Sequence, residues 1–233
     1  MPTSLLKKRI LMTVIGVLLC GISVGFFKRA AFGVDPFQSL MSGLNAVIPI
    51  SFGTLYMAAN LLLLLFAFCF DRHYIGVATF VNLFLLGYVT EFTLYLLERA
   101  LPELGIPGRA VLLVIGIVVL CLSSALYFTS DLGVSTYDAI ALVMSGKWKV
   151  ASFRVCRVGC DLVCVAGGAA LFFLGGGTWS ALPEIVGVGT IITAFFMGPL
   201  IELFNVHVAR PLLYGRFGAA ESEPSQQETD SPR

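Results

Sequence analysis

The chain has 233 residues, of which 58% are hydrophobic and only 12% are charged. Soluble domains usually carry about 25% charged residues, so this composition excludes an ordinary water-exposed surface and favours a membrane protein. The formal net charge of +1 disfavours a nucleic-acid partner, which would need a basic face. The six cysteines all lie inside apolar runs, so we interpret them as small hydrophobic residues of the spans and not as a disulfide framework.

Six segments approach the roughly 20 apolar residues that a helix needs to cross a bilayer. They are Ile10–Phe27, Phe52–Phe70, Tyr74–Leu97, Ala110–Phe128, Phe153–Leu174 and Ile185–Phe204. Segments of this length and uniform apolarity are typical of helices and not of barrel strands. The sequence therefore predicts an all-α membrane protein with six transmembrane helices in the lipid bilayer. A single transmembrane domain would cover residues 1–217, and the polar residues 218–233 would form a disordered cytoplasmic tail.

Basic residues near the ends of the spans predict the orientation. If the N-terminus is inside, the inner group is Lys7, Lys8, Arg9, Arg72, Lys147, Lys149, Arg210 and Arg216, and the outer group is Lys28, Arg29, Arg99 and Arg109. The larger inner group predicts a multi-pass protein of the bacterial inner (cytoplasmic) membrane with both termini in the cytoplasm. The basic run before the first span could also begin a signal peptide, but its apolar stretch is long and recurs later, so we expect it to be retained.

Residues recur along the chain at fixed spacings, which is the signature of an internal repeat. Gly33-Val34 recurs 100 positions later as Gly133-Val134, and Gly76-Val77-Ala78-Thr79 recurs 111 positions later as Gly187-Val188-Gly189-Thr190. We therefore predict two copies of one three-span unit, at about residues 10–98 and 110–206. Because three is odd, the second copy would enter the membrane from the opposite side. Such inverted repeats are common in secondary transporters.

A shorter segment lies between the first two spans of each copy, at residues 36–47 and 136–145. A 12-residue helix is only about 18 Å long, too short to cross a bilayer. Asp35-Pro36 is typical of a helix start, and Ser135 can cap the equivalent start. Two interpretations stay open: an amphipathic helix lying at the membrane interface, or a re-entrant half-helix that reaches the midplane.

These motifs resemble those of the YczE/YitT-type group of bacterial multi-pass membrane proteins, over about residues 10–205. The residues that carry the resemblance are Leu132-Gly133-Val134 with Asp138, the turn Gly33-Val34-Asp35-Pro36-Phe37, Gly187-Val188-Gly189-Thr190 with Gly198-Pro199, and the pair Arg157 and Asp161. The group's Gly-x-x-Pro-x-Asp turn is split here: the first copy keeps Pro36 but has Gln38 at the acidic position, and the second keeps Asp138 but has Thr136 for proline. The resemblance implies the membrane fold and no defined activity.

Charged residues inside a span are costly and are therefore candidates for function. Arg154, Arg157 and Asp161 lie near one helix face, and the last two can pair at i,i+4. Together with Asp35 and Asp138, they are our predicted substrate pathway. The alternative is a self-paired anchor near the cytoplasmic end of the span, with Arg154 reaching outward.

Glu91 and Glu202 occupy equivalent repeat positions near the ends of their spans. We predict them as candidate coupling carboxylates for a proton or cation, the alternative being carboxylates at the headgroup level. Cys156, Cys160 and Cys164 form a stripe at helical spacing, but no matching His or Cys cluster exists elsewhere, so we expect no metal and no cofactor. Nucleotide-binding loops and nucleophile elbows are also missing from the sequence, so we do not expect an enzyme.

The sequence therefore favours a small-solute transporter or permease, with its pathway between two inverted repeats and an unknown small solute as its partner. This step is an analogy from architecture. The alternative is a non-transporting membrane scaffold or accessory subunit, whose partner surface would be the cytoplasmic segment 138–157. A homo-oligomer is compatible with either hypothesis.

Overall fold

The computed structural model describes residues 3–72 and 75–214, apart from the side chains of Thr3, Ser4 and Arg154. Every regular element in these two ranges is helical. In chain order the elements are α1 (Thr3–Ala30), α2 (Pro36–Val47), α3 (Phe52–Phe70), α4 (Val77–Ala100), α5 (Ile106–Ser130), α6 (Thr136–Leu142), the π-helical turn η2 (Val143–Lys147), α7 (Phe153–Leu174), α8 (Leu182–Ile185), α9 (Val188–Phe204), the π-helical turn η3 (Asn205–Ala209) and α10 (Arg210–Tyr214). The predicted disordered tail, 218–233, lies outside the described residues.

Six helical segments are long and apolar enough to cross a membrane: α1, α3, α4, α5, α7 and the segment from α8 to α10. The predicted bounds of α3 and α7 are confirmed, whereas α1 and α5 extend past the predicted spans at both ends. The predicted last span, Ile185–Phe204, is wrong at its start. Gly187 adopts an extended conformation, so α9 begins only at Val188, and Ile185 ends the separate short helix α8.

The polarity of the surface is reversed relative to that of a soluble protein. Large apolar side chains such as Leu62, Val163 and Phe196 are exposed, while Thr13, Asn60 and other polar side chains are buried. A soluble monomer rarely exposes so much contiguous apolar surface. Six apolar helices with this surface are consistent with an integral membrane protein in contact with lipid.

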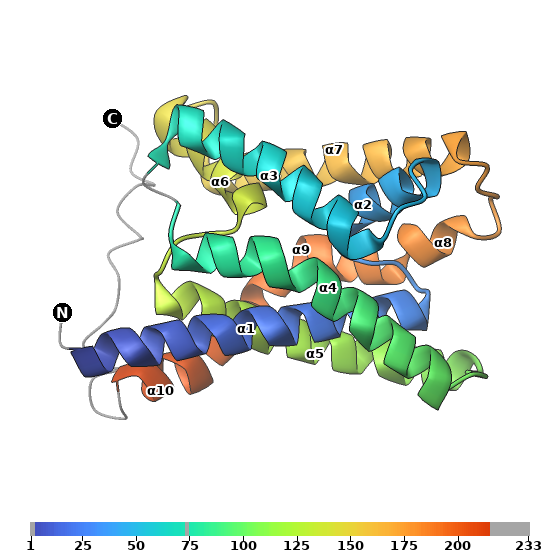
Figure 1. Ribbon diagram of the computed structural model, residues 1–233, viewed down its shortest axis with the longest axis horizontal. Helices are drawn as coiled ribbons and strands as arrows, with labels where there is room; N and C mark the ends of the chain where they lie inside the picture. The colour runs from blue at the N-terminus through green and yellow to red at the C-terminus, as the bar shows by residue number, and fades with distance from the viewer. Residues whose placement is uncertain (1–2, 73–74, 215–233) are drawn as a thin grey trace.

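Helix α1 lies between α4 and α5, and it runs antiparallel to α5 (Figure 1). Glycines make these approaches close. A Cβ atom added to Gly21 would lie 2.8 Å from the side chain of Val89 on α4, and one added to Gly16 would lie 3.1 Å from the carbonyl oxygen of Ser123 on α5. Small residues at these points let the backbones pack tightly, as is usual where helices associate in lipid.

The two short helices begin inside the bundle (Figure 1). Pro36, Phe37 and Gln38 at the start of α2 are buried, while Val47 at its end is exposed. This burial disfavours the interpretation of a helix lying flat at an interface. In the second copy, the predicted segment 136–145 is α-helical only to Leu142 and continues as η2.

Each short helix packs against a long helix of the other half: α2 against α7, and α6 against α3. The contact between α2 and α7 is close, because a Cβ atom on Gly43 would collide with the backbone of Gly168. The two halves are therefore intertwined and do not form two separate bundles.

The turns that lead into the short helices are held by the starts of α9 and α4. The amide of Gly189 donates to the carbonyl of Phe32 at 2.7 Å, and the amide of Ala78 donates to the carbonyl of Leu132 at 3.0 Å. Each turn contains a glycine with positive φ, +93° at Gly33 and +107° at Gly133. Glycine adopts this conformation without the strain of a Cβ atom.

We predict that Gly33→Ala strongly destabilises the protein. A residue with a side chain costs about 1–2 kcal/mol at such a φ, and the new Cβ atom would also collide with the backbone of Gly187. The measurement is thermal unfolding of the purified protein in detergent, followed by circular dichroism.

Gly176→Ala is the matched control, because Gly176 also has a positive φ (+88°) but has nothing within 4 Å of an added Cβ atom. Gly176→Ala should lose only the folding free energy that a side chain costs at positive φ, with no added cost from a steric collision. Equal losses for the two variants would contradict the tight contact between the turn and the start of α9.

Candidate functional site

A cavity of about 720 Å³ lies between α1, α5, α7 and α9 and the first turns of α2 and α6. Its volume is within the usual range for small-molecule sites, about 300–1,000 Å³. Its lining runs from Gln38 in the first turn of α2 to the start of α7 and the last turn of α9, and these two helix ends lie at the end of the bundle where α1 begins (Figure 1). The cavity therefore reaches from the interior toward one end of the molecule.

The cavity exists because α7 stands apart from α9. The helices α3 and α4, which the predicted repeat matches with α7 and α9, pack together where the start of α3 meets the stretch of α4 from Asn82 to Glu91. A Cβ atom on Gly87 of α4 would lie 2.9 Å from the Cα atom of Gly53 on α3. Gly198 of α9 has the repeat position of Gly87, yet it has nothing within 4 Å. The start of α3 thus lies tightly against α4, whereas α9 has open space at Gly198.

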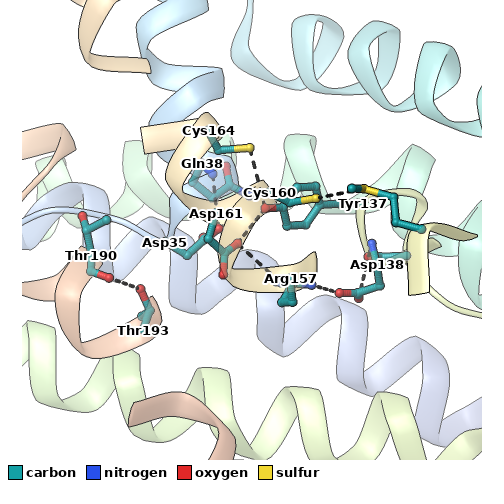
Figure 2. A network of polar contacts seen from close by, with 12 residues as sticks. Asp35, Gln38, Tyr137, Asp138, Arg157, Cys160, Asp161, Cys164, Thr190 and Thr193 are labelled. Carbon is teal, nitrogen blue, oxygen red and sulfur yellow. Dashed lines mark hydrogen bonds and ion pairs between the residues drawn. The ribbon is translucent and has the colours of Figure 1, made fainter. Parts of the chain in front are cut away.

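A network of polar side chains centred on Arg157 lies in the wall of the cavity (Figure 2). The Arg157 guanidinium pairs with Asp138 of α6 and, at 3.3 Å, with Asp161 one turn further along α7. The Tyr137 hydroxyl donates to Asp161 at 2.6 Å, and the Ser135 hydroxyl donates to Asp138 at 2.6 Å. One arginine therefore binds two carboxylates and joins α6 to α7.

Asp35 lies close to this network but takes no part in it (Figure 2). It caps α2, and its Oδ1 atom accepts a hydrogen bond from the amide of Gln38 at 3.2 Å. The described part of the chain offers it no ion-pair partner. A carboxylate inside a span region usually has a charged partner, so this one has spare capacity for a bound group.

Two buried polar atoms of the cavity wall lack partners among the described residues. They are Oε1 of Gln38 and the hydroxyl of Tyr127, and both side chains line the cavity. Gln38 is only 3% exposed and Tyr127 only 7%. Buried polar atoms are nearly always hydrogen-bonded, so two such atoms in one cavity wall indicate a place for a polar ligand.

Aromatic rings from three helices surround the same inner end. Phe37 of α2 stacks on Tyr137 of α6 with the ring centroids 4.9 Å apart, and it meets Tyr56 of α3 edge-on at 5.8 Å. These side chains all line the cavity. The site thus combines acidic and amide oxygens with aromatic faces.

Most residues of the predicted pathway come together in the structure. Asp35, Asp138, Arg157 and Asp161 all line the cavity, and the predicted pair of Arg157 with Asp161 is confirmed. The side chain of Arg154 lies outside the described residues. Within residues 3–72 and 75–214, no three His, Cys, Asp or Glu side chains are grouped to hold a metal ion.

The two candidate coupling carboxylates have different surroundings. Glu202 lines the cavity and pairs with Arg210 at 3.6 Å. Glu91 instead accepts hydrogen bonds from the Ser51 hydroxyl at 3.2 Å and the Gly53 amide at 3.3 Å, at the start of α3. A carboxylate is stabilised by the partial positive charge at a helix N-terminus, so Glu91 joins α4 to α3.

The sequence did not identify Gln38, Tyr127 or Tyr137 as site residues. Gln38 was visible only as a departure from the acidic turn motif, and Tyr137 only as the repeat equivalent of Phe37. Gln38 and Tyr137 share one signal, a polar or aromatic group just after a predicted helix start, whereas Tyr127 lies in the last turn of α5. That signal points to a site only once the starts of α2 and α6 are known to meet.

Comparisons with known proteins identify the family. A family model described as a family of unknown function, DUF6198, matches residues 7–206. The chain belongs to this family. The family model does not name the YczE/YitT-type group, so the similarity to that group stays a resemblance.

Two bacterial relatives are similar to the chain, and both are described as uncharacterized. The protein YyaS of Bacillus subtilis (strain 168) is 21% identical over 201 residues, which are 85% of this chain and 93% of that protein. A protein of Haemophilus influenzae is 26% identical over 137 residues, which are 58% of this chain and 56% of that protein. No solved structure matches the chain.

We predict that Arg157→Met destabilises the protein by about 2–4 kcal/mol, because it leaves two largely buried carboxylates without their shared cation. Removing the charges of the partners as well, in the triple variant Arg157→Met/Asp138→Asn/Asp161→Asn, should recover much of this loss. Thermal unfolding in detergent measures both. Arg99→Met is the control, because Arg99 is exposed and lies over the ring of Tyr95, away from the network. A triple variant less stable than Arg157→Met would contradict the network as drawn.

Proposed function

We propose that this protein is a small-solute permease whose pathway runs between two inverted three-span repeats and passes through the cavity. The observation that carries the proposal is the unequal packing of corresponding helix pairs. The α3–α4 pair is closed and the α7–α9 pair is open, so the cavity is accessible from one end. A solute carrier with two equivalent halves needs this asymmetry in order to expose its site to one side at a time.

Reciprocal contacts support the inversion. Gly16 approaches Tyr127, and its equivalent Gly116 approaches Phe27, the equivalent of Tyr127. The stacked rings of Phe37 and Tyr137 are themselves equivalents, 100 positions apart. A twofold axis in the membrane plane, between the antiparallel helices α1 and α5, would produce such pairs (Figure 1).

On this proposal α2 and α6 are re-entrant half-helices. Both begin inside the bundle and run outward toward opposite ends (Figure 1). Non-helical backbone at membrane depth is tolerated only where it is buried in protein or lines a cavity, and the turns before α2 and α6 meet this condition. The meeting point of two half-helices between inverted repeats is the usual place for a transport site.

Transport would exchange the states of the two helix pairs. Closing α7 onto α9 would bring Gly198 against α7 and would let Glu202 accept hydrogen bonds at the start of α7, as Glu91 does at the start of α3. Opening α3 from α4 would release Glu91. Glu91 would then hold α3 against α4 in one state, and Glu202 would hold α7 against α9 in the other. This role is more specific than the coupling role expected from the sequence.

The open end of the cavity would face the cytoplasm. Arg9 of α1 pairs with Asp131 at the end of α5, and Lys147 binds the carbonyl of Phe70, so basic residues of several elements collect at the end where α1 begins. Under the positive-inside rule this end is cytoplasmic, which would place both termini there in an inner membrane. We expect no enzymatic activity.

The test uses proteoliposomes of the purified protein loaded with a panel of labelled amines, amino acids and sugars. We predict that Gly198→Trp leaves the fold intact, because the position is open in this state, but abolishes solute exchange by preventing α7 from closing on α9. Gly159→Trp is the matched control on α7: nothing lies within 4 Å of its added Cβ atom either, and it should exchange normally.

Accessibility supplies a second readout. A cysteine placed at Val158 or Thr193, which line the cavity, should react with a water-soluble maleimide from the cytoplasmic side. No exchange of any solute, together with unreactive cysteines at both positions, would contradict the permease and favour the scaffold or accessory subunit.

A further inference from the structure

We propose that the inner end of the cavity binds an organic cation, a protonated amine, held by Asp35 and Gln38. This inference rests on the proposed function and gives its substrate class. Three features of the site lead to it: the charge balance, the unpartnered acceptors and the aromatic rings.

The charge balance of the cavity wall is negative. Its charged side chains among the described residues are Asp35, Asp138, Arg157, Asp161 and Glu202. Arg157 is shared by two of these carboxylates, and Glu202 pairs with Arg210. Asp35, by contrast, has no ion pair among the described residues and interacts with Arg157 and Lys28 only at longer range. The N-termini of α2 and α6 add about half a positive charge each, which is not enough to reverse the sign. An anion at this point would face more negative than positive charge.

The unpartnered atoms add hydrogen-bond acceptors. Oε1 of Gln38 can only accept, and the carboxylate of Asp35 has accepted only from the helix amide at its cap. The Tyr127 hydroxyl can also accept. An ammonium group, with several N–H donors and one positive charge, satisfies an amide oxygen and a carboxylate at once. A sugar or a neutral alcohol would satisfy the amide oxygen but not the charge.

The aromatic rings suit the same ligand. Phe37, Tyr56, Tyr127 and Tyr137 line the cavity around Asp35 and Gln38. Ring faces attract cations, and they also pack against the apolar part of an amine. The Tyr137 ring already has Arg157 4.5 Å from its centroid and Phe37 stacked at 4.9 Å, so the rings left for the ligand are those of Tyr56 and Tyr127.

The experiment compares three probes of similar shape: phenethylammonium, 2-phenylethanol and 3-phenylpropanoate. Binding to the full-length protein in detergent is measured by calorimetry and by the shift in melting temperature. We expect the ammonium probe to bind and to stabilise the protein. The alcohol should bind at least about tenfold more weakly, which corresponds to about 1.4 kcal/mol of binding free energy. The carboxylate should not bind.

Variants assign the contacts. Asp35→Asn should weaken binding of the ammonium probe by about tenfold or more, since it removes the charge, while Asn caps a helix as well as Asp does, so α2 should stay intact. Gln38→Leu should weaken binding and Gln38→Glu should strengthen it. Glu98→Gln is the control, because Glu98 is exposed and lies outside the cavity.

The outcomes separate this inference from the permease itself. Tighter binding of the carboxylate, equal binding of the alcohol, no binding of any probe, or an unchanged affinity in Asp35→Asn would overturn the cation site. Exchange of neutral or anionic solutes, but not of amines, in proteoliposomes would support the permease and contradict the cation site. Binding of the ammonium probe without exchange of any solute would support the cation site and contradict the permease.

Discussion

The structure depends on how two stretches of non-helical backbone are satisfied inside an apolar bundle. The chain leaves α1 and α5 in extended turns, and backbone amides and carbonyls in such turns need partners where water is scarce. The partners come from the starts of α9 and α4. The Gly189 amide binds the Phe32 carbonyl, and the Thr79 hydroxyl donates to the Val134 carbonyl at 2.7 Å. Glycine turns and helix starts therefore fix each other's position across the two halves.

The rest of the site follows from this constraint. Because the turns end inside the bundle, α2 and α6 start there, and the side chains of their first turns meet. Phe37 and Tyr137 stack, Asp138 reaches Arg157, and Asp35 and Gln38 are left facing the cavity. Moving either turn by one residue would change which side chains meet. The same turns that satisfy the backbone therefore decide the chemistry of the cavity.

The sequence predicted what depends on local pattern. Apolar runs bounded by polar residues gave the bounds of α3 and of α7, whose run is interrupted by three charged residues, and the i,i+4 spacing gave the pair of Arg157 with Asp161. It did not predict the break at Gly187, because apolar residues continue on both sides of it. The lack of a partner for Gln38 Oε1 depends on α2 crossing to the other half, and the pairing of Arg157 with Asp138 depends on how α6 packs against α7. No local pattern contains that information.

The two predicted copies carry different residues at the first turns of α2 and α6, which line the cavity. At one turn position the first copy has Gln38 and the second has Asp138, and only the second is neutralised by Arg157. A site built by two identical halves would present the same group twice, so a ligand could not be oriented. With an amide and a free carboxylate on one side and a neutralised carboxylate on the other, a bound cation has one preferred orientation. On the permease proposal, the unequal residues Gln38 and Asp138 would give the site its direction, and the similar backbone turns before α2 and α6 would let the two halves exchange conformations.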